Sequence, residues 1–414
     1  MKFTQEDFLK LFNLQKNISF EDFSKKLAVL NGSDTSGTFA VRSDLDTFVA
    51  RVAKKDNRGA RLDEYKRKLY RIIVEEPEVA LAAWFQRTVA VTEDLDFYFQ
   101  MPDTTVRVGD TFAGRTLAKY GRVCKNINFD NFFNTKKLYA NDFEYTFGML
   151  KAMFEDCKLR NSLVGPAFFD HICNIEDDYN LFWADFMMGC NRASIFNPVT
   201  YRGIMEELFT GDTIFAPCMG WNAYQLAFYN SNWKKFISTD VIPGVVDNGK
   251  KLHAEWQAYR GRSLFEIEDK TVDLYQCPSE LLEQRHGFVT RYHNQVDAVL
   301  FSPPYYDLEI YPGAEQSFTN YPNYEDWLEN YWEATVKTAK AVLRPGGRFA
   351  FVISNYRNKA KQEVTISKDM CEVVKRHLGE PTHYKVQWSA IAGGRQAKKM
   401  KDGNFEDLWL FEKN

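Results

Sequence analysis

The sequence lacks the paired cysteines that structural zinc sites and redox motifs require. Its seven cysteines are scattered, and none of them forms a Cys-x-x-Cys pair. An odd number of scattered cysteines favours neither a disulfide framework nor a zinc site, and it fits a reducing cytoplasm. The six histidines also lack the His-Glu-x-x-His spacing of zinc hydrolases, so the sequence predicts no metal site.

Long hydrophobic runs and a dominant charge are missing as well. No run reaches the roughly 18 apolar residues of a transmembrane helix, so we expect no membrane partner. The chain starts with the polar segment Met1-Lys2-Phe3-Thr4-Gln5, which predicts no secretory signal. Lys and Arg number 53 against 56 Asp and Glu, which gives a net charge of −3. A nucleic-acid site would therefore have to be a local basic patch.

What the sequence does have is length and many aromatic side chains. Its 414 residues correspond to roughly two or three domains, and 45% hydrophobic residues suffice for a sizeable core. Aromatic residues make up 15% of the chain, with 34 Phe and 21 Tyr. Most such side chains fill cores, but a surface that stacks on nucleobases needs them too.

The first 190 residues have a mainly helical pattern. Apolar residues recur at helical spacing among charged ones over residues 60–76, 78–91, 141–158 and 179–190. Residues 102–121 contain a proline and three glycines, which favour a loop or a short strand. We therefore predict a mainly helical domain over residues 1–190, for target recognition or oligomerisation, followed by a second domain over residues 191–414.

From residue 191 onward, short apolar runs alternate with helical patterns. The runs that predict strands are 213–216, 235–239, 272–275, 297–301 and 348–354. The segments between them that predict helices are 223–229, 324–343 and 365–377. This alternation predicts an α/β fold with a mostly parallel sheet, which residues 384–390 and 407–411 close as an antiparallel pair. Ligands of such a sheet bind beyond the carboxyl ends of its strands.

The strongest motif in the chain, Ser302-Pro303-Pro304-Tyr305, follows the fourth expected strand. Two consecutive prolines fix φ and remove two backbone donors, which leaves the Pro303 carbonyl rigid and with few local partners. A hydroxyl and a carbonyl can accept hydrogen bonds from the two N–H groups of an amine, while the tyrosine ring can stack on a planar group. Proline pairs are also common in surface loops. The place of this one at the carboxyl end of a strand favours a site for a nucleobase that carries an amine.

This motif resembles the catalytic motif of the AdoMet-dependent DNA amino-methyltransferases, which modify N4 of cytosine or N6 of adenine. The resemblance covers roughly residues 195–414, and the serine form is more typical of the N4-cytosine enzymes. Related motifs occur in methyltransferases of RNA and of protein glutamine. The resemblance implies a class I methyltransferase-like Rossmann sheet, with Ser302, Pro303, Pro304 and Tyr305 as catalytic residues and with Ser302 also near the cofactor.

The segment from Ala216 to Asn222 resembles the cofactor loop of the same family, Asp-Pro-Phe-x-Gly-Ser-Gly. Pro217 and Gly220 align with the proline and the first glycine of that loop. Ala216 stands where the family has Asp, and Asn222 stands where it has the second glycine. The resemblance implies that Ala216, Pro217, Met219 and Gly220 contact S-adenosyl-L-methionine, and the two departures leave a variant cofactor open.

Two polar residues at strand ends have distinct interpretations. Asp240 lies 20 residues after Gly220, a distance typical of an acidic residue that accepts hydrogen bonds from ribose hydroxyls. An aspartate there could instead be a simple helix N-cap. Cys218 follows a proline, as the nucleophile of C5-cytosine methyltransferases does. That nucleophile follows the fourth strand, however, so we interpret Cys218 as a small buried residue.

Two other segments resemble cofactor-binding parts of the family. The resemblance places the loop after the third strand near the adenine ring, with Gln276 and Cys277 as cofactor residues. Gln276 or Ser279 would contact the adenine amine. Phe196 and Asn197 precede the helix that leads into the first strand, and they resemble the family's upstream cofactor segment.

The chain has no insert of the usual size for target recognition between the cofactor loop and the catalytic motif. Target recognition could come from the N-terminal half, from the aromatic segment 306–323, or from the loop between the last two strands. Tyr306 follows the motif directly and is the expected base-pocket residue of the second segment. The last loop carries Arg395, Lys398 and Lys399, which suit phosphate contacts, although short charged runs are often just solvated surface.

The sequence thus predicts an enzyme that transfers a methyl group to the exocyclic amine of a flipped base in double-stranded DNA, with cytosine N4 favoured over adenine N6. A restriction-modification context would suit such an enzyme. The alternatives are an AdoMet enzyme that acts on RNA, a protein amide or a small amine, and an enzyme of nucleobase hypermodification. A nucleic-acid-binding module that keeps the fold without turnover is the non-enzymatic alternative.

Overall fold

The described residues lie mostly in one of the two units into which the chain divides. The computed structural model describes residues 18–22, 67, 75, 95–102, 105–115, 118–128, 136–137, 195–263, 266–311, 315–358, 362–391 and 405–414. By its contacts the chain divides into one unit of residues 1–89 and 140–191 and a second unit of residues 90–139 and 192–414. Almost all described residues belong to the second unit. Nearly every residue of the expected N-terminal helices lies outside the described residues, so the helical domain stays a prediction.

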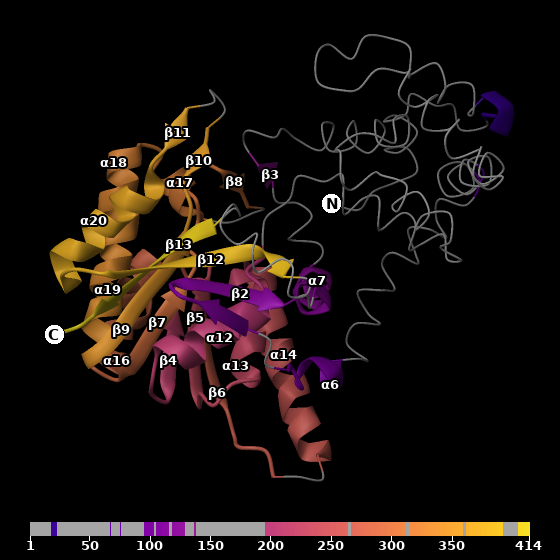
Figure 1. Ribbon diagram of the computed structural model, residues 1–414, viewed down its shortest axis with the longest axis horizontal. Helices are drawn as coiled ribbons and strands as arrows, with labels where there is room; N and C mark the ends of the chain where they lie inside the picture. The colour runs from indigo at the N-terminus through magenta and orange to yellow at the C-terminus, as the bar shows by residue number, and fades with distance from the viewer. Residues whose placement is uncertain are drawn as a thin grey trace. The chain divides into compact units, whose positions relative to one another are not determined.

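A nine-stranded sheet forms the centre of the second unit (Figure 1). Its strands, in spatial order, are β1 (Thr105–Val108), β2 (Thr111–Arg115), β12 (Thr382–Ile391), β13 (Phe405–Glu412), β9 (Leu343–Ile353), β7 (Val296–Phe301), β4 (Thr213–Ala216), β5 (Lys235–Asp240) and β6 (Thr271–Gln276). Strands β9, β7, β4, β5 and β6 are parallel, and β13 pairs antiparallel with both β9 and β12. This confirms the expected α/β class I methyltransferase-like sheet with its antiparallel closing strand.

The hairpin of β1 and β2 lies within residues 102–121, where the sequence favoured a loop or a short strand, and it extends the sheet. Gly109 turns the hairpin with φ of +62°, a conformation that suits glycine, and β2 pairs parallel with β12. Helix α7 (Ala118–Ile127) follows directly, and α6 (Leu95–Tyr98) precedes the hairpin. The described residues between 95 and 128 therefore belong to the sheet unit, whereas the sequence pattern placed the domain boundary near residue 190.

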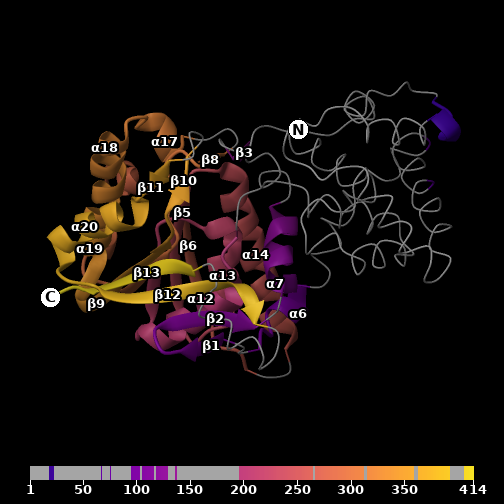
Figure 2. The ribbon, with the colours of Figure 1, turned by 45° about the horizontal axis from the view of Figure 1, so that its top comes forward.

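Helices cover the sheet in two groups (Figure 2). One group consists of α7, α12 (Pro198–Leu208), α13 (Ala223–Tyr229) and α14 (Pro243–Arg262). The other consists of α15 (Leu282–His286), α16 (Phe288–Tyr292), α18 (Tyr324–Asp326), α19 (Ala334–Val342) and α20 (Ile366–Leu378), with the π-helical segment Trp327–Glu333 joining α18 to α19. The sequence missed α14, a 20-residue helix. Such alternation of strands and helices is what right-handed crossovers on a parallel sheet produce.

Short elements and one revised boundary complete the unit. The short elements are β3 (Lys136–Lys137), β8 (Glu309–Ile310), β10 (Tyr356–Arg357), β11 (Glu363–Val364) and α17 (Ser317–Asn320). The fifth predicted strand, 348–354, is β9, which already begins at Leu343. The reason is pairing with the C-terminal segment, since Gly346 N–H donates to the Lys413 carbonyl at 2.7 Å.

Aromatic side chains fill the core of this unit, which accounts for much of the unusual composition. Trp327 and Trp332 are completely buried, and Phe349 and Phe351 of β9 lie beside Trp332. No helix among the described residues is both long and apolar enough to cross a membrane. The carboxyl ends of β4, β5, β6 and β7 meet at one edge of the sheet, which is where ligands of parallel sheets bind.

Candidate functional site

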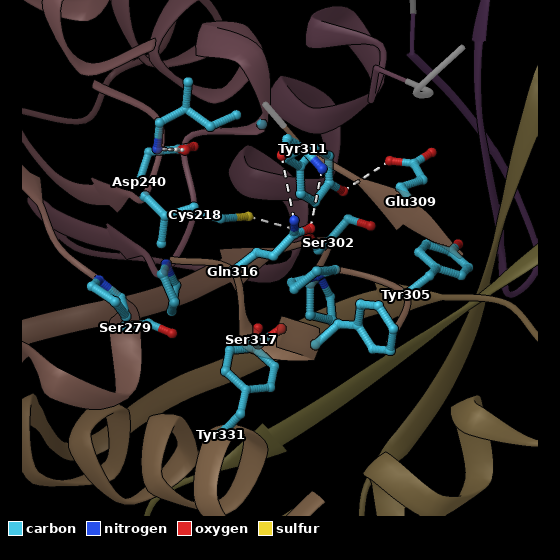
Figure 3. A pocket seen from close by; sticks show the side chains of 18 of the residues that line it. Cys218, Asp240, Ser279, Ser302, Tyr305, Glu309, Tyr311, Gln316, Ser317 and Tyr331 are labelled. Carbon is cyan, nitrogen blue, oxygen red and sulfur yellow. Dashed lines mark hydrogen bonds between the residues drawn. The ribbon is translucent and has the colours of Figure 1, made fainter. Parts of the chain in front are cut away.

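A pocket lies at this edge of the sheet, and most of the predicted site residues line it (Figure 3). The empty space within its walls is about 1080 Å³, including solvent at its mouth. The predicted residues in its wall are Phe196, Pro217, Gly220, Asp240, Cys277, Ser279, Ser302, Pro303, Pro304, Tyr305 and Tyr306. Strands β4, β5, β6 and β7 each contribute the segment that follows them, so residues far apart in the sequence meet here.

Four predicted cofactor residues do not line the pocket. Asn197 caps α12, where its Oδ1 accepts the N–H of Val199 at 3.0 Å. Ala216 and Met219 are completely buried, and Met219 reaches the site only through its backbone N–H. Gln276 is exposed at the end of β6, while Ser279 of the same loop lies in the wall. The predicted phosphate contacts, Arg395, Lys398 and Lys399, lie outside the described residues.

The cofactor-like loop consists of consecutive left-handed residues. Gly220, Trp221 and Asn222 have φ values of +51°, +58° and +64°. At Gly220 an added Cβ would lie 2.4 Å from Cζ of Tyr224, so only glycine fits. Asn222 replaces the family's second glycine because asparagine also tolerates this conformation. Its Nδ2 donates to the Val245 carbonyl at 3.2 Å, and its Oδ1 accepts Nδ2 of Asn128 at 2.9 Å.

Asp240 faces the pocket with both carboxylate oxygens held by backbone donors. Oδ2 accepts the N–H of Met219 at 3.3 Å, and Oδ1 accepts the N–H of Ile242 at 3.0 Å. Burial raises the pKa of Asp240 to about 6. The backbone hydrogen bonds lower this pKa, but burial has the larger effect. A carboxylate fixed in this way can accept hydrogen bonds from ligand hydroxyls, and it is not the helix N-cap that the alternative interpretation required, since Ile242 occupies that position of α14.

The Ser-Pro-Pro-Tyr motif is held by its backbone and by its tyrosine ring. The Ser302 N–H donates to the Tyr224 hydroxyl at 3.0 Å, and the Ser302 carbonyl accepts the Cys218 thiol at 3.2 Å. The Tyr305 hydroxyl donates to Oε1 of Glu406 at 2.7 Å. Within the described part of the chain, the Ser302 hydroxyl and the Pro303 carbonyl accept no hydrogen bond. Both acceptors therefore stay available to a ligand amine.

Cys218 has no nucleophilic character in this environment. Burial raises the pKa of its thiol far above the ordinary value, and the charge of Asp240 raises it further. The thiol is therefore protonated at neutral pH, where it donates to Ser302. The protonated thiol agrees with the rejection of Cys218 as a nucleophile, but the prediction of a buried residue is wrong, since Cys218 is partly exposed in the pocket wall.

Several residues of the pocket wall were missed by sequence reasoning. They include Glu309 and Tyr311, whose side chains bond at 2.8 Å, and Gln316, whose Oε1 accepts the Tyr311 N–H at 3.1 Å. Only their membership of the aromatic segment 306–323 pointed to them. Glu406 comes from β13, about a hundred residues after the motif, and no spacing rule in the sequence connects the two.

Tyr306 is in the wall, but most of its ring packs against other aromatic rings. The ring centroid lies 5.1 Å from that of Tyr324 and 5.5 Å from that of Trp327. Its hydroxyl donates to the Pro322 carbonyl. Tyr306 therefore braces the wall next to the motif, with one edge facing the cavity.

The wall of the pocket is acidic. Four carboxyl side chains line it, from Asp240, Glu280, Glu309 and Glu406, and its described lining contains no Lys, Arg or His. Burial raises the pKa of Glu280 to about 7. Such a lining attracts cations and amine donors and repels anions. Among the described residues, no group of three or more His, Cys, Asp and Glu side chains could hold a metal ion.

Comparisons with known proteins give likeness of fold only. No family model matches the chain, and no curated protein matches it. Solved structures that resemble it include 1,6-didemethyltoxoflavin-N1-methyltransferase of Burkholderia thailandensis, 14% identical over 52% of this chain and 76% of that chain, with a TM-score of 0.31. TrmN of Thermus thermophilus is 14% identical over 52% of this chain and 49% of that one, with a TM-score of 0.32. The N-methyltransferase NodS of Bradyrhizobium japonicum is 9% identical over 52% of this chain and 93% of its own, with a TM-score of 0.30. TM-scores this low carry no conclusion about activity.

Proposed function

We propose that this chain is an AdoMet-dependent methyltransferase that modifies the exocyclic amine of a DNA base, with N4 of cytosine favoured over N6 of adenine. One observation carries the proposal. The Ser302 hydroxyl and the Pro303 carbonyl lie in the wall of the same pocket as Gly220 of the left-handed loop and the carboxylate of Asp240. Two amine acceptors and a cofactor-like loop thus share a single cavity.

The residues present fit S-adenosyl-L-methionine. Asp240 offers a fixed carboxylate for ribose hydroxyls, and the loop at Gly220 leaves backbone room beside it. The acidic lining suits a ligand that carries a sulfonium and an ammonium group. Glu280 could accept a hydrogen bond from the adenine amine in place of the exposed Gln276. When bound, the cofactor supplies an activated methyl group.

The acceptor end of the pocket orients an amine rather than activating a nucleophile. Ser302 and Pro303 accept hydrogen bonds from its two N–H groups and turn the nitrogen lone pair away from them, and the proton that the methylated amine loses leaves to solvent. The Tyr305 ring cannot rotate away from the cavity, because its hydroxyl is bonded to Glu406 and also accepts the N–H of Ser354 at 3.1 Å. Positioning of this kind supplies a large share of the rate enhancement when the transferred group is already reactive.

A base must leave its helix to reach such a pocket. Flipping costs a few kcal/mol of stacking, which contacts of Tyr305 with the base would offset in part. The DNA target and the preference for cytosine are proposed from the serine form of the motif. An RNA base, a protein amide, a small amine or a different transferred group would use the same acceptors, so the experiment must separate them.

The test is mass spectrometry of nucleosides from cells that lack their own amino-methyltransferases. Cells expressing the wild-type chain should accumulate N4-methylcytosine in DNA, and cells expressing Ser302→Ala should not. Ser231→Ala is the matched control, because it removes a hydroxyl that lies outside the pocket and bonds the Phe228 carbonyl. A new mass only in RNA, or a nucleoside of another added mass, would replace the DNA assignment. No change in either polymer would refute it.

A further inference from the structure

The backbone of Ser302 is held on both sides by the segment that forms the cofactor-like loop. Its N–H donates to the Tyr224 hydroxyl at 3.0 Å. Its carbonyl accepts the thiol of Cys218 at 3.2 Å, and both Ser302 and Cys218 are labelled in Figure 3. These two hydrogen bonds join the segment that follows β4 to the loop after β7.

Tyr224 is anchored so that its hydroxyl has a single position. Its side chain is 1% exposed, and its ring stacks on that of Tyr201 with centroids 4.3 Å apart and an interplanar angle of 18°. The Tyr201 hydroxyl donates to the Leu300 carbonyl of β7 at 2.7 Å. The stacked pair thus fixes the end of β7 and presents one acceptor to the Ser302 N–H.

The same tyrosine touches the loop at its tightest point. An added Cβ at Gly220 would lie 2.4 Å from Cζ and 2.6 Å from Cε2 of Tyr224, so the glycine backbone rests on the hydroxyl end of the ring. Gly220 has φ of +51° and lines the pocket. A ligand that orders the backbone at Gly220 therefore orders the ring that holds Ser302.

We propose that Tyr224 is a positioning residue that couples occupation of the cofactor loop to the orientation of the Ser302 motif. The inference rests on the proposed function, since it assigns the ligand of the loop to AdoMet. A bound cofactor restrains Gly220, Tyr224 and then Ser302, so the amine acceptors are in place only when the donor is present. By linkage, a bound acceptor must strengthen cofactor binding by the same factor.

Hydrogen–deuterium exchange of the peptide around Ser302 tests this coupling without activity. Pro303 and Pro304 have no amide, so a short peptide across the motif reports mainly on the Ser302 N–H. In the wild-type protein, S-adenosylhomocysteine should slow this exchange. In Tyr224→Phe, which keeps the stacked ring, the slowing should disappear. Tyr201→Phe is the matched control, because it removes an equally buried hydroxyl that is bonded to the Leu300 carbonyl of β7 and not to Ser302, and it should retain the slowing.

Kinetics provide the second measurement. Loss of the Tyr224 hydroxyl leaves a buried N–H without its acceptor, which should lower kcat about tenfold and change the KM for AdoMet less than about twofold. Should Tyr224→Phe not fold, Cys218→Ala should weaken the protection of Ser302, and Cys218→Ser, which keeps a donor and an acceptor, should restore it.

The outcomes separate the two proposals. If the wild-type chain binds neither AdoMet nor S-adenosylhomocysteine, the proposed function fails and the coupling fails with it. If the chain binds them and transfers a methyl group, but Tyr224→Phe matches Tyr201→Phe in exchange and in kcat, the coupling alone is overturned.

Discussion

Cofactor binding should depend on pH through Asp240. Burial raises the pKa of this carboxyl to about 6, and in the proposed complex its ionised form accepts the ribose hydroxyls. If only the ionised form of Asp240 supports AdoMet binding, the apparent Kd for AdoMet is multiplied by 1 + 10^(pKa − pH), where the pKa is that of Asp240. This factor is about 1.1 at pH 7 and about 11 at pH 5 for a pKa of about 6. We therefore expect AdoMet affinity to fall about tenfold between pH 7 and pH 5.

Stability in the absence of ligand should change in the opposite direction. The folded pKa of Asp240 is raised, so the protonated carboxyl favours the fold. That contribution is complete below the unfolded pKa of about 3.9 and is lost as the pH rises through about 6. Melting temperatures with and without S-adenosylhomocysteine over this range separate the two effects.

Calorimetric titration between pH 5 and pH 7.5 is the assay, with two variants to assign the group. Asp240→Asn should bind weakly at every pH and lose the step near pH 6. Glu280→Gln removes the other carboxyl of the pocket with a raised pKa, about 7, and should leave that step in place. A step that survives in Asp240→Asn and disappears in Glu280→Gln would refute the assignment to Asp240.

Three further substitutions test separate parts of the structure. Gly220→Ala should abolish AdoMet binding in a calorimetric titration, since its Cβ would lie 2.4 Å from the Tyr224 ring; unchanged affinity would contradict the loop geometry. Glu406→Ala should lower kcat roughly tenfold with AdoMet affinity retained, because Tyr305 loses its 2.7 Å hydrogen bond; single-turnover kinetics check this, and an equal loss of affinity would argue against an acceptor-side role. Trp332→Ala, at a completely buried position, should lower the free energy of unfolding by about 3–5 kcal/mol in urea titrations, and a loss below about 1 kcal/mol would contradict its place in the core.

The positions of the central strands could be predicted from the sequence because each has a local pattern of its own. The run 213–216 is β4 to the residue, and the runs 235–239, 272–275 and 297–301 match β5, β6 and β7 to within one residue at each end, whereas β9 begins five residues before the predicted run 348–354. Each run is a short apolar segment that ends at a turn or polar residue, and parallel strands joined by helices have one preferred handedness. The boundary of the sheet unit could not be predicted, since the hairpin 105–115 pairs with a strand that lies some 270 residues later.

The candidate site could also be predicted only in part from the sequence. The sequence alone was enough to predict that the Pro303 carbonyl is rigid and that a tight turn needs glycine. Both features follow from the covalent geometry of proline and glycine. The sequence also determined that these segments end parallel strands, and therefore that they share one edge of the sheet. Two contacts became visible only in the folded structure. Glu406 bonds Tyr305, and the buried side chain of Tyr224 holds Ser302 next to the cofactor-like loop. Those contacts join segments about 80 to 100 residues apart, and the burial that makes them specific exists only once the strands have assembled.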